Sequence, residues 1–186
     1  MAAIEITVDD REVKKLIKSL NKDQRQTALV RSINRALGGI QTDTNKSVRK
    51  ELNVTTRTVK ETFKLKKANK GDISASLKST GKPINFYDKK TGKLNFSGRQ
   101  TKKGMAFTIK KGRGRQKFKS AFVATMPTGF RGVFVRKIGQ RKIKALHTTR
   151  VPDILDNQET IDKVLENAGE RFIKNLNQQV EYLLNG

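Results

Sequence analysis

Positive charge is concentrated in the middle of this chain, and it limits how compactly that part can fold. Residues 46–150 carry thirty Lys and Arg against four Asp and Glu. Residues 1–45 have a net charge of +2 and residues 151–186 one of −4. Like charges at the density of the middle segment repel one another and oppose compaction. The total of +24 predicts an anionic partner, and nucleic acid is the usual one because neutralised phosphates release counterions.

The composition predicts a modest core with long basic loops. Hydrophobic residues make up 34% of the 186, below the usual share of a globular domain. The length predicts a single domain over residues 1–186, with 86–117 as an extended basic loop or hairpin inserted in it. There is no Cys, which excludes disulfides and thiolate zinc sites. We expect no signal peptide, because MAAIEITVDD lacks a basic segment followed by an apolar one, and no membrane span.

Apolar residues at helical spacing predict helices towards both ends. A short strand over 4–8 precedes a helix over 9–21, which Asp9 would cap. A long helix over 23–53 and a short one to about Phe63, capped by Thr55, follow. Ile161 to Leu183 predict a final helix of about seven turns, starting near Asp156.

The long helix contains an adjacent glycine pair, Gly38 and Gly39. Each glycine costs about 1 kcal/mol relative to Ala in a helix interior. The pair therefore predicts either a kink or a close contact with the helix backbone.

The period changes to two in the middle of the chain and predicts four strands, over 73–77, 105–109, 118–124 and 133–135. The connection 86–104 is long, contains three glycines and is expected to contribute little core. The order of elements predicts an α+β fold. It has N-terminal helices, a central antiparallel β-sheet with a long basic hairpin or loop, and a long C-terminal helix.

The basic hairpin is the strongest candidate for a functional surface. Its cations have no acidic residue among them, whereas interspersed acids would be expected if solubility were their only purpose. The predicted DNA-facing patch consists of Lys102, Lys103, Lys110, Lys111, Arg113, Arg115, Lys117 and Lys119. The nearby aromatics Phe86, Tyr87 and Phe96 are either core or interface residues, so base stacking on single strands is not supported.

Catalytic residues are not evident. His147 is the only histidine and has no acid near it in sequence. The four acids of the basic segment are too scattered to suggest a metal centre, and they are Glu51, Glu61, Asp72 and Asp88. We predict no enzyme, no cofactor and no metal; a nuclease using these acids is the least favoured alternative.

Residues 47–60 resemble the centre of a helix-turn-helix, with a turn at 52–55 and Thr58 and Val59 on the next helix. Arg49 occupies a position where that motif prefers Ala or Gly. The alternative function is therefore a sequence-specific DNA-binding regulator using this segment.

The stripe of the C-terminal helix is longer than a modest core requires, so part of it is expected to meet a neighbouring subunit or the sheet of the same chain. The predicted assembly interface consists of Phe172, Leu176, Val180 and Leu183.

Four stretches in order resemble the minor tail protein Z family of long-tailed phages. They are SINRALGGIQTDTNKSVRKEL (32–52), VTTRTVKETFKLKKA (54–68), SAFVATMPTGFRGVFVRKIGQRKIKAL (120–146), and Arg150-Val151-Pro152 with the terminal helix. The resemblance covers residues 25–184 and implies a structural virion protein that completes the head-proximal end of the tail. It implies a homo-oligomeric ring in the neck, assembled in the host cytoplasm. The implied partners are other copies of the chain, the tail terminator, the head–tail connector, and packaged duplex DNA bound without sequence preference.

Overall fold

The computed structural model divides the chain into two compact units, each discontinuous in sequence. It describes residues 3–4, 10–88, 90–136, 139, 142–155 and 158–185. Unit 1 comprises residues 1–45, 63–80 and 155–186, and unit 2 comprises 46–62 and 81–154. The fold is α+β, with helices towards both ends and antiparallel sheets between them, as the sequence predicts. Folding of 1–186 as a single domain stays a prediction.

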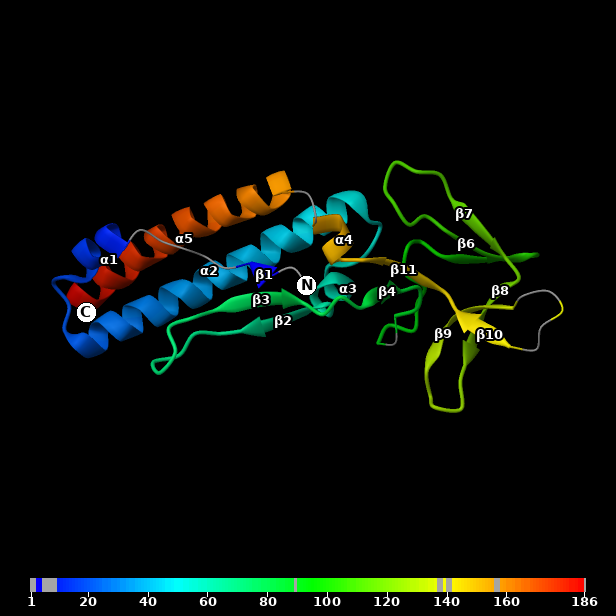
Figure 1. Cartoon of the computed structure of the whole chain (residues 1–186), viewed down its shortest axis with the longest axis horizontal. Coiled ribbons are helices and arrows are strands. Elements are labelled where there is room, and N and C mark those ends of the chain that lie inside the picture. The colour runs from blue at the N-terminus through cyan, green and yellow to red at the C-terminus, as the bar shows by residue number, and fades with distance from the viewer. Residues whose placement is uncertain are drawn as a thin grey trace. The chain divides into compact units, whose positions relative to one another are not determined.

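Unit 1 is built on two long helices and one short one. They are α1 (Asp10–Ile17), α2 (Lys22–Glu51, whose last turns belong to unit 2) and α5 (Gln158–Asn185). Figure 1 shows α5 running along α2, with α1 beside the C-terminal half of α5. Their apolar stripes meet in a buried cluster that comprises Leu20, Ala28, Ala36, Phe172, Leu176 and Val180. The helices predicted from spacing alone are therefore confirmed.

A reciprocal cap fixes the start of α2. The Asn21 amide donates to Gln24 Oε1 at 3.1 Å, and the Gln24 amide donates to Asn21 Oδ1 at 2.9 Å. Both satisfy backbone N–H groups that a helix start leaves without a partner. The predicted caps at Asp9 and Asp156 lie outside the described residues.

One glycine of the pair in α2 is in close contact with α5. Arg171 of α5 crosses Gly39 and pairs with Asp43 at 2.5 Å. A Cβ on Gly39 would lie 2.7 Å from Arg171 Nη1 and 3.0 Å from its Cδ, whereas a Cβ on Gly38 would meet nothing within 4 Å. The close contact predicted for the pair therefore exists at Gly39.

The two glycines should respond in different ways to Ala. Gly38→Ala should raise the free energy of unfolding by up to about 1 kcal/mol, because Ala favours the helix and the site is open. Gly39→Ala should gain less or lose stability, because Arg171 must leave its place against the helix. Denaturant unfolding of both variants measures the difference. In an Arg171→Ala background Gly39→Ala should stabilise as Gly38→Ala does; equal gains from both in the wild-type background would contradict this contact.

Unit 1 also holds a small antiparallel sheet of order β1-β3-β2. Its strands are β1 (Ala3–Ile4), β2 (Phe63–Lys66) and β3 (Ser76–Ser79). Two predicted boundaries were wrong: Phe63 begins a strand instead of ending a helix, and β3 begins at Ser76, not at Ile73. Ile73 lies after a turn in which the Asn69 and Asp72 backbones bond to each other, and its side chain is 40% exposed. Residues 5–8 of the predicted first strand lie outside the described residues.

Unit 2 contains eight strands and two short helices among its described residues. The strands are β4 (Pro83–Asn85), β5 (Arg99–Thr101), β6 (Gly104–Phe107), β7 (Gln116–Lys119), β8 (Ala121–Thr125), β9 (Arg131–Arg136), β10 (Ile143–Ala145) and β11 (His147–Arg150). The helices are α3 (Thr56–Lys60) and α4 (Pro152–Leu155). The strands form three antiparallel sheets, β5-β6-β7, β10-β9-β8 and β11-β4, instead of one central sheet.

The predicted strand over 118–124 is two strands, because the backbone turns at Ser120. This residue has a φ of 58°, which no extended strand accommodates. The chain therefore leaves β7 and enters β8 of a different sheet within one residue.

An aromatic cluster forms the core around β6. The Phe86 ring lies 4.4 Å from Phe107, 5.3 Å from Phe96 and 5.8 Å from Phe118, measured between centroids. Phe86 and Phe96 are each 1% exposed and Tyr87 is 7% exposed. The expectation that the connection 86–104 contributes little core is wrong, since it supplies the centre of this cluster. Of the two interpretations left open for these aromatics, the core interpretation holds.

Candidate nucleic-acid interface

The three-stranded sheet β5-β6-β7 carries the predicted basic patch and has two unlike faces. Met105 and Phe107 of the central strand are buried, and Phe107 packs on Phe118 of β7. Because successive residues of a strand point to opposite faces, Gly104 and Ala106 lie on the other face of the sheet. There Ala106 lies between Arg99 and Lys117, and Gly104 lies between Thr101 and Lys119. Ala106, which is itself only 1% exposed, thus separates a cation on each outer strand, whereas at Gly104 only β7 carries a cation.

Gly104 permits this arrangement through its backbone. Its φ of 144° is rarely adopted by residues with a side chain, and any Cβ there would collide with the Phe118 carbonyl. The Ser120 amide donates to the Lys103 carbonyl at 3.0 Å, which ties the β5–β6 turn to the end of β7.

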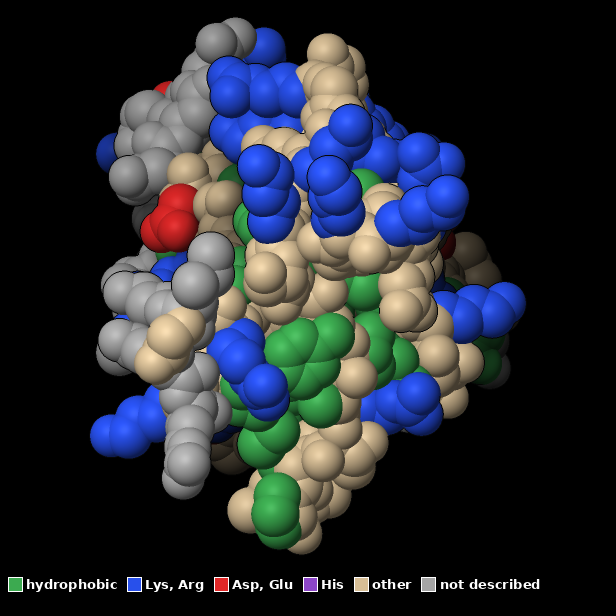
Figure 2. All heavy atoms as spheres, turned by 90° about the vertical axis from the view of Figure 1, so that its right-hand side faces the viewer, with side chains coloured by type: hydrophobic (Ala, Val, Ile, Leu, Met, Phe, Trp, Pro, Cys, Tyr) green, Lys and Arg blue, Asp and Glu red, His purple; other side chains and the backbone are tan. Residues whose placement is uncertain are grey.

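The eight predicted cations all belong to this sheet and its turns, but they gather at its two ends. Lys102, Lys103 and Lys119 lie at one end of the β6–β7 ladder; Lys110, Lys111, Arg113 and Arg115 lie in the turn at the other, and Lys117 lies between. The ladder of four residues separates the ends by about 10 Å at the usual rise of a strand. All are exposed except Lys110, which is half-buried. Figure 2 shows Lys and Arg side chains gathered over the part of unit 2 where Figure 1 draws β6 and β7.

The turn of 108–115 is held by the end of α2. The Lys111 amide donates to the Glu51 carbonyl at 2.7 Å, and the Asn53 amide donates to the Ile109 carbonyl at 2.9 Å. The first bond satisfies a carbonyl that the helix end leaves without an intrahelical partner. The cationic turn is therefore anchored by its backbone, which leaves most of its side chains to solvent.

The charge of the chain is divided between the two units. Unit 2 has 25 Lys and Arg against 4 Asp and Glu, a net of +21, whereas unit 1 has 16 against 13, a net of +3. Within the described part of the chain, none of the eight patch cations forms an ion pair. Unit 2 therefore presents unneutralised positive charge, as expected of a surface that binds phosphates.

The helix-turn-helix interpretation is not supported by the geometry of residues 47–60. Thr55 caps α3 as predicted and accepts from the Thr58 amide at 3.3 Å. However, α3 has only five residues, less than two turns, and its Thr58 and Val59 are buried. A recognition helix presents its side chains to the bases of the major groove, and the two residues predicted for this role, Thr58 and Val59, are buried instead.

The candidate catalytic residues are not brought together. Glu61 pairs with Arg57 at 3.5 Å and with Lys90 at 3.2 Å, Asp72 belongs to unit 1, and His147 is exposed on β11. In the described residues, no three His, Asp or Glu lie close enough to hold a metal ion.

Two carboxyl groups among the described residues have a lowered pKa, whereas a general acid needs a raised one. Side-chain hydrogen bonds from Lys66 and then Ser74 lower the pKa of Asp72 to about 2. Burial raises the pKa of Asp88, but hydrogen bonds from the Lys90 amide and from the side chain and amide of Thr91 together lower it by more. Both carboxylates therefore accept hydrogen bonds that stabilise the turns in which they lie.

The predicted assembly interface on α5 belongs to the core of unit 1. Phe172, Leu176 and Val180 are buried against α1 and α2, and Leu183 packs on the same cluster half-buried. Phe172, Leu176 and Val180 are thus largely covered within the chain, whereas Leu183 keeps part of its surface exposed; an assembly contact through these residues stays a prediction. The exposed apolar residues of α5 are instead Tyr182, at 64%, and Leu184, at 53%. The sequence pattern did not single them out because they lie next to the stripe.

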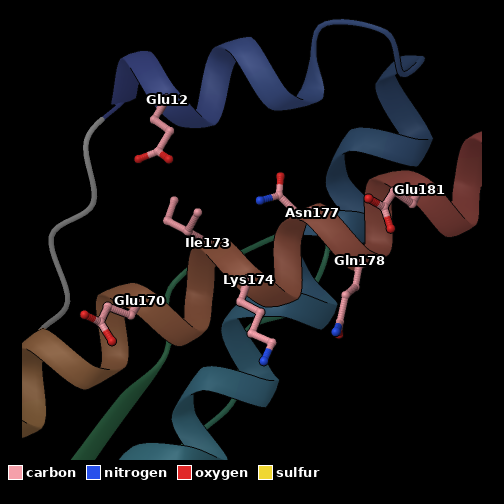
Figure 3. Close-up of a pocket in the computed structure, with 7 residues that line it drawn as sticks. All are labelled: Glu12, Glu170, Ile173, Lys174, Asn177, Gln178 and Glu181. Carbon is pink, nitrogen blue, oxygen red and sulfur yellow. The ribbon is translucent and has the colours of Figure 1, made fainter.

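A groove between α1 and α5 was also missed from the sequence. It has a volume of about 680 Å³, and Glu12, Glu170 and Glu181 line it together with Lys174. Figure 3 shows Glu12 reaching from α1 towards α5, while Glu170 and Glu181 come from α5 itself. Carboxylates repel phosphate, so this side of unit 1 is unsuited to DNA.

The described residues thus form a small α+β protein in which one of the two units is strongly cationic. The chain belongs to the prophage minor tail protein Z (GPZ) family, whose sequence model matches residues 10–185. No match was found among curated proteins or among solved structures. The chain is therefore a structural protein of the phage tail, located in the virion. No helix in the described ranges is long and apolar enough to cross a membrane.

Proposed function

We propose that this protein completes the head-proximal end of the phage tail, so that a filled head can join it, and that the cationic sheet of unit 2 contacts the packaged duplex DNA. The observation that carries the DNA contact is the net charge of +21 on unit 2, against +3 on unit 1. A protein beside the end of a packaged genome meets whatever sequence is there. Phosphate contacts suit that task because they hold the duplex without reading its bases.

The buried aromatic cluster favours duplex DNA over single strands. Single-strand binding relies on exposed aromatic rings on which bases stack. Phe86, Phe96 and Phe107 are at most 1% exposed and supply no such platform. The described surface of the sheet is suited to phosphate contacts, and the role that we propose is structural.

The tail-completion role also includes assembly with other copies and with neck proteins. We place the homo-oligomeric ring contact at the C-terminal end of α5, where Tyr182 and Leu184 expose apolar surface that the chain itself leaves open. The partners at the two faces of this ring are the tail terminator and the head–tail connector. The protein would join the tail in the neck after synthesis in the host cytoplasm.

The DNA contact predicts strongly salt-dependent binding. Random-sequence duplexes should bind the intact protein, and log affinity should fall linearly with log salt, with a slope of about −0.9 for each phosphate neutralised. Anisotropy titrations between about 50 and 200 mM salt measure this slope. A flat response, or one operator-like sequence that random DNA fails to displace, would exclude the phosphate-only contact.

A further inference from the structure

A hollow in unit 2, separate from the cationic sheet, gathers two arginines without any acidic residue. It has a volume of about 570 Å³ and lies where the end of α2 and the start of α3 meet residues 94–97. Its polar lining residues are Arg49, Asn53, Thr55, Thr56, Arg57, Asn95 and Ser97. No carboxylate lines it, so the hollow is suited to an anion.

Backbone and side-chain bonds hold the walls of the hollow in place. Asn53 Nδ2 donates to Ser97 Oγ at 2.8 Å and so joins the two sides. Arg49 Nε donates to the Val54 carbonyl at 3.2 Å, which closes the turn between the helices and leaves the two Nη groups as further donors. The residue that is atypical of a helix-turn-helix thus has a local structural role.

The hydroxyl groups differ in what they can donate. Thr58 Oγ1 donates to Asn95 Oδ1 at 3.3 Å, so the 2.9 Å contact between Thr55 and Thr58 uses the Thr55 proton. Ser97 Oγ accepts from Asn53, so its own proton remains to be donated. Ser97, the second amide proton of Asn53 and the guanidinium groups therefore supply the donors.

Ser97 lies at the hollow in an unfavourable backbone conformation that its surroundings maintain. Phe96 and Ser97 have φ values of 57° and 47°, a region that residues with side chains seldom adopt. The buried Phe96 ring and the bond from the Thr108 amide to the Phe96 carbonyl, at 2.8 Å, maintain it. Such conformations persist only where the surrounding structure fixes them.

We propose that this hollow binds a phosphate group of the DNA backbone. Guanidinium groups bind phosphate oxygens through paired, charge-assisted hydrogen bonds, and a hydroxyl and an amide complete the set. Arg57 also pairs with Glu61 at 3.5 Å, but both side chains are nearly half exposed, so that pair is weak. The inference rests on the proposed DNA contact and adds to it a second contact point outside the β5-β6-β7 sheet.

The test follows backbone amide signals by NMR in the intact chain, with inorganic phosphate and then a short random duplex as probes. Both should shift the signals of Asn53, Arg57 and Ser97. Phosphate affinity should fall about tenfold in Arg57→Gln and in Ser97→Gly, since each removes a donor to the anion. Gly favours the φ of Ser97, so the second variant should keep the fold. Arg150→Gln, which removes a charge from unit 2 outside the hollow, is the matched control.

The outcomes separate this inference from the proposed function. If the duplex shifts signals of the cationic sheet but not those of the hollow, the hollow contacts no DNA and the proposed function stands. Phosphate that shifts nothing in the hollow, or Arg57→Gln and Ser97→Gly that bind it as Arg150→Gln does, would also overturn the inference. A wild-type chain that binds no duplex at all would end both proposals.

Discussion

Neutralising four lysines of the cationic sheet should weaken binding to duplex DNA by about tenfold at 0.1 M salt for each phosphate that is no longer neutralised. The variant changes Lys102, Lys103, Lys117 and Lys119 to Gln. All four are exposed, and they lie together at one end and along one face of the β6–β7 ladder. The sheet already fixes the backbone of these lysines, so only their side chains lose freedom on binding, and the decrease in affinity should approach the effect of all four. Anisotropy with random duplexes gives the affinity and the salt slope.

A matched variant distinguishes the effect of where charge is removed on DNA affinity from the effect of how much charge is removed. Lys15, Lys18, Lys22 and Lys78 are exposed lysines of unit 1, and changing them to Gln removes the same total charge. This control should bind DNA almost as the wild type does. Both variants should keep their thermal midpoints, because exposed substitutions usually change stability by within about 0.5 kcal/mol. Equal decreases of affinity in the two variants would show that net charge alone determines DNA binding and that the sheet is not a specific contact surface.

Phe86→Ala should cost about 3–5 kcal/mol of stability, the range for truncating a buried phenylalanine. Phe86 packs against three other rings and is 1% exposed, so its removal leaves a cavity at the centre of unit 2. A single domain is stable by only about 5–15 kcal/mol, so most of the margin of this unit would be lost. Denaturant unfolding followed by circular dichroism, with amide signals of β6 and β7, measures the effect.

Tyr182→Ala is the control for this substitution. It removes a larger side chain that is 64% exposed, and it should leave the free energy of unfolding within about 0.5 kcal/mol of the wild type. Phe86→Ala should also lower the affinity for DNA as unit 2 unfolds, because the cationic face lies on the other side of the sheet that Phe86 supports. A Phe86→Ala chain as stable as Tyr182→Ala would contradict the assignment of the aromatic core.

The helices could be predicted from sequence because their information is local. The stripe of α5 and the Thr55 cap each depend on residues within one or two turns of each other. The aromatic core could not be predicted in this way. Phe86, Phe107 and Phe118 are separated by long polar and basic stretches. The pairing of β6 with β7 brings Phe107 and Phe118 together, and Phe86 meets them from the segment that follows β4.

The candidate site could be predicted only in part, because some of its features are local in sequence and others are not. A dense run of cations without acids is visible in the sequence, and the structure assigns all eight to one sheet. The sequence does not show that they divide between two ends, since that depends on strand register. The sequence also does not show which residues cover the apolar stripe of α5. It therefore predicts an interface at Phe172, which the structure buries against α1 and α2. The hollow beside Ser97 leaves no sequence signal, because its backbone conformation depends on the burial of Phe96.

The central claim, that this protein completes the tail for head joining, is tested most directly by electron microscopy of a lysate from a phage that lacks its gene. We predict filled heads and full-length tails that remain separate, and joined particles once the wild-type chain is supplied. The wild-type tails should carry a ring at their head-proximal end. The variant with Gln at positions 102, 103, 117 and 119 should fail to restore joined, DNA-retaining particles. Normally joined, infectious particles in the absence of the protein would contradict the account.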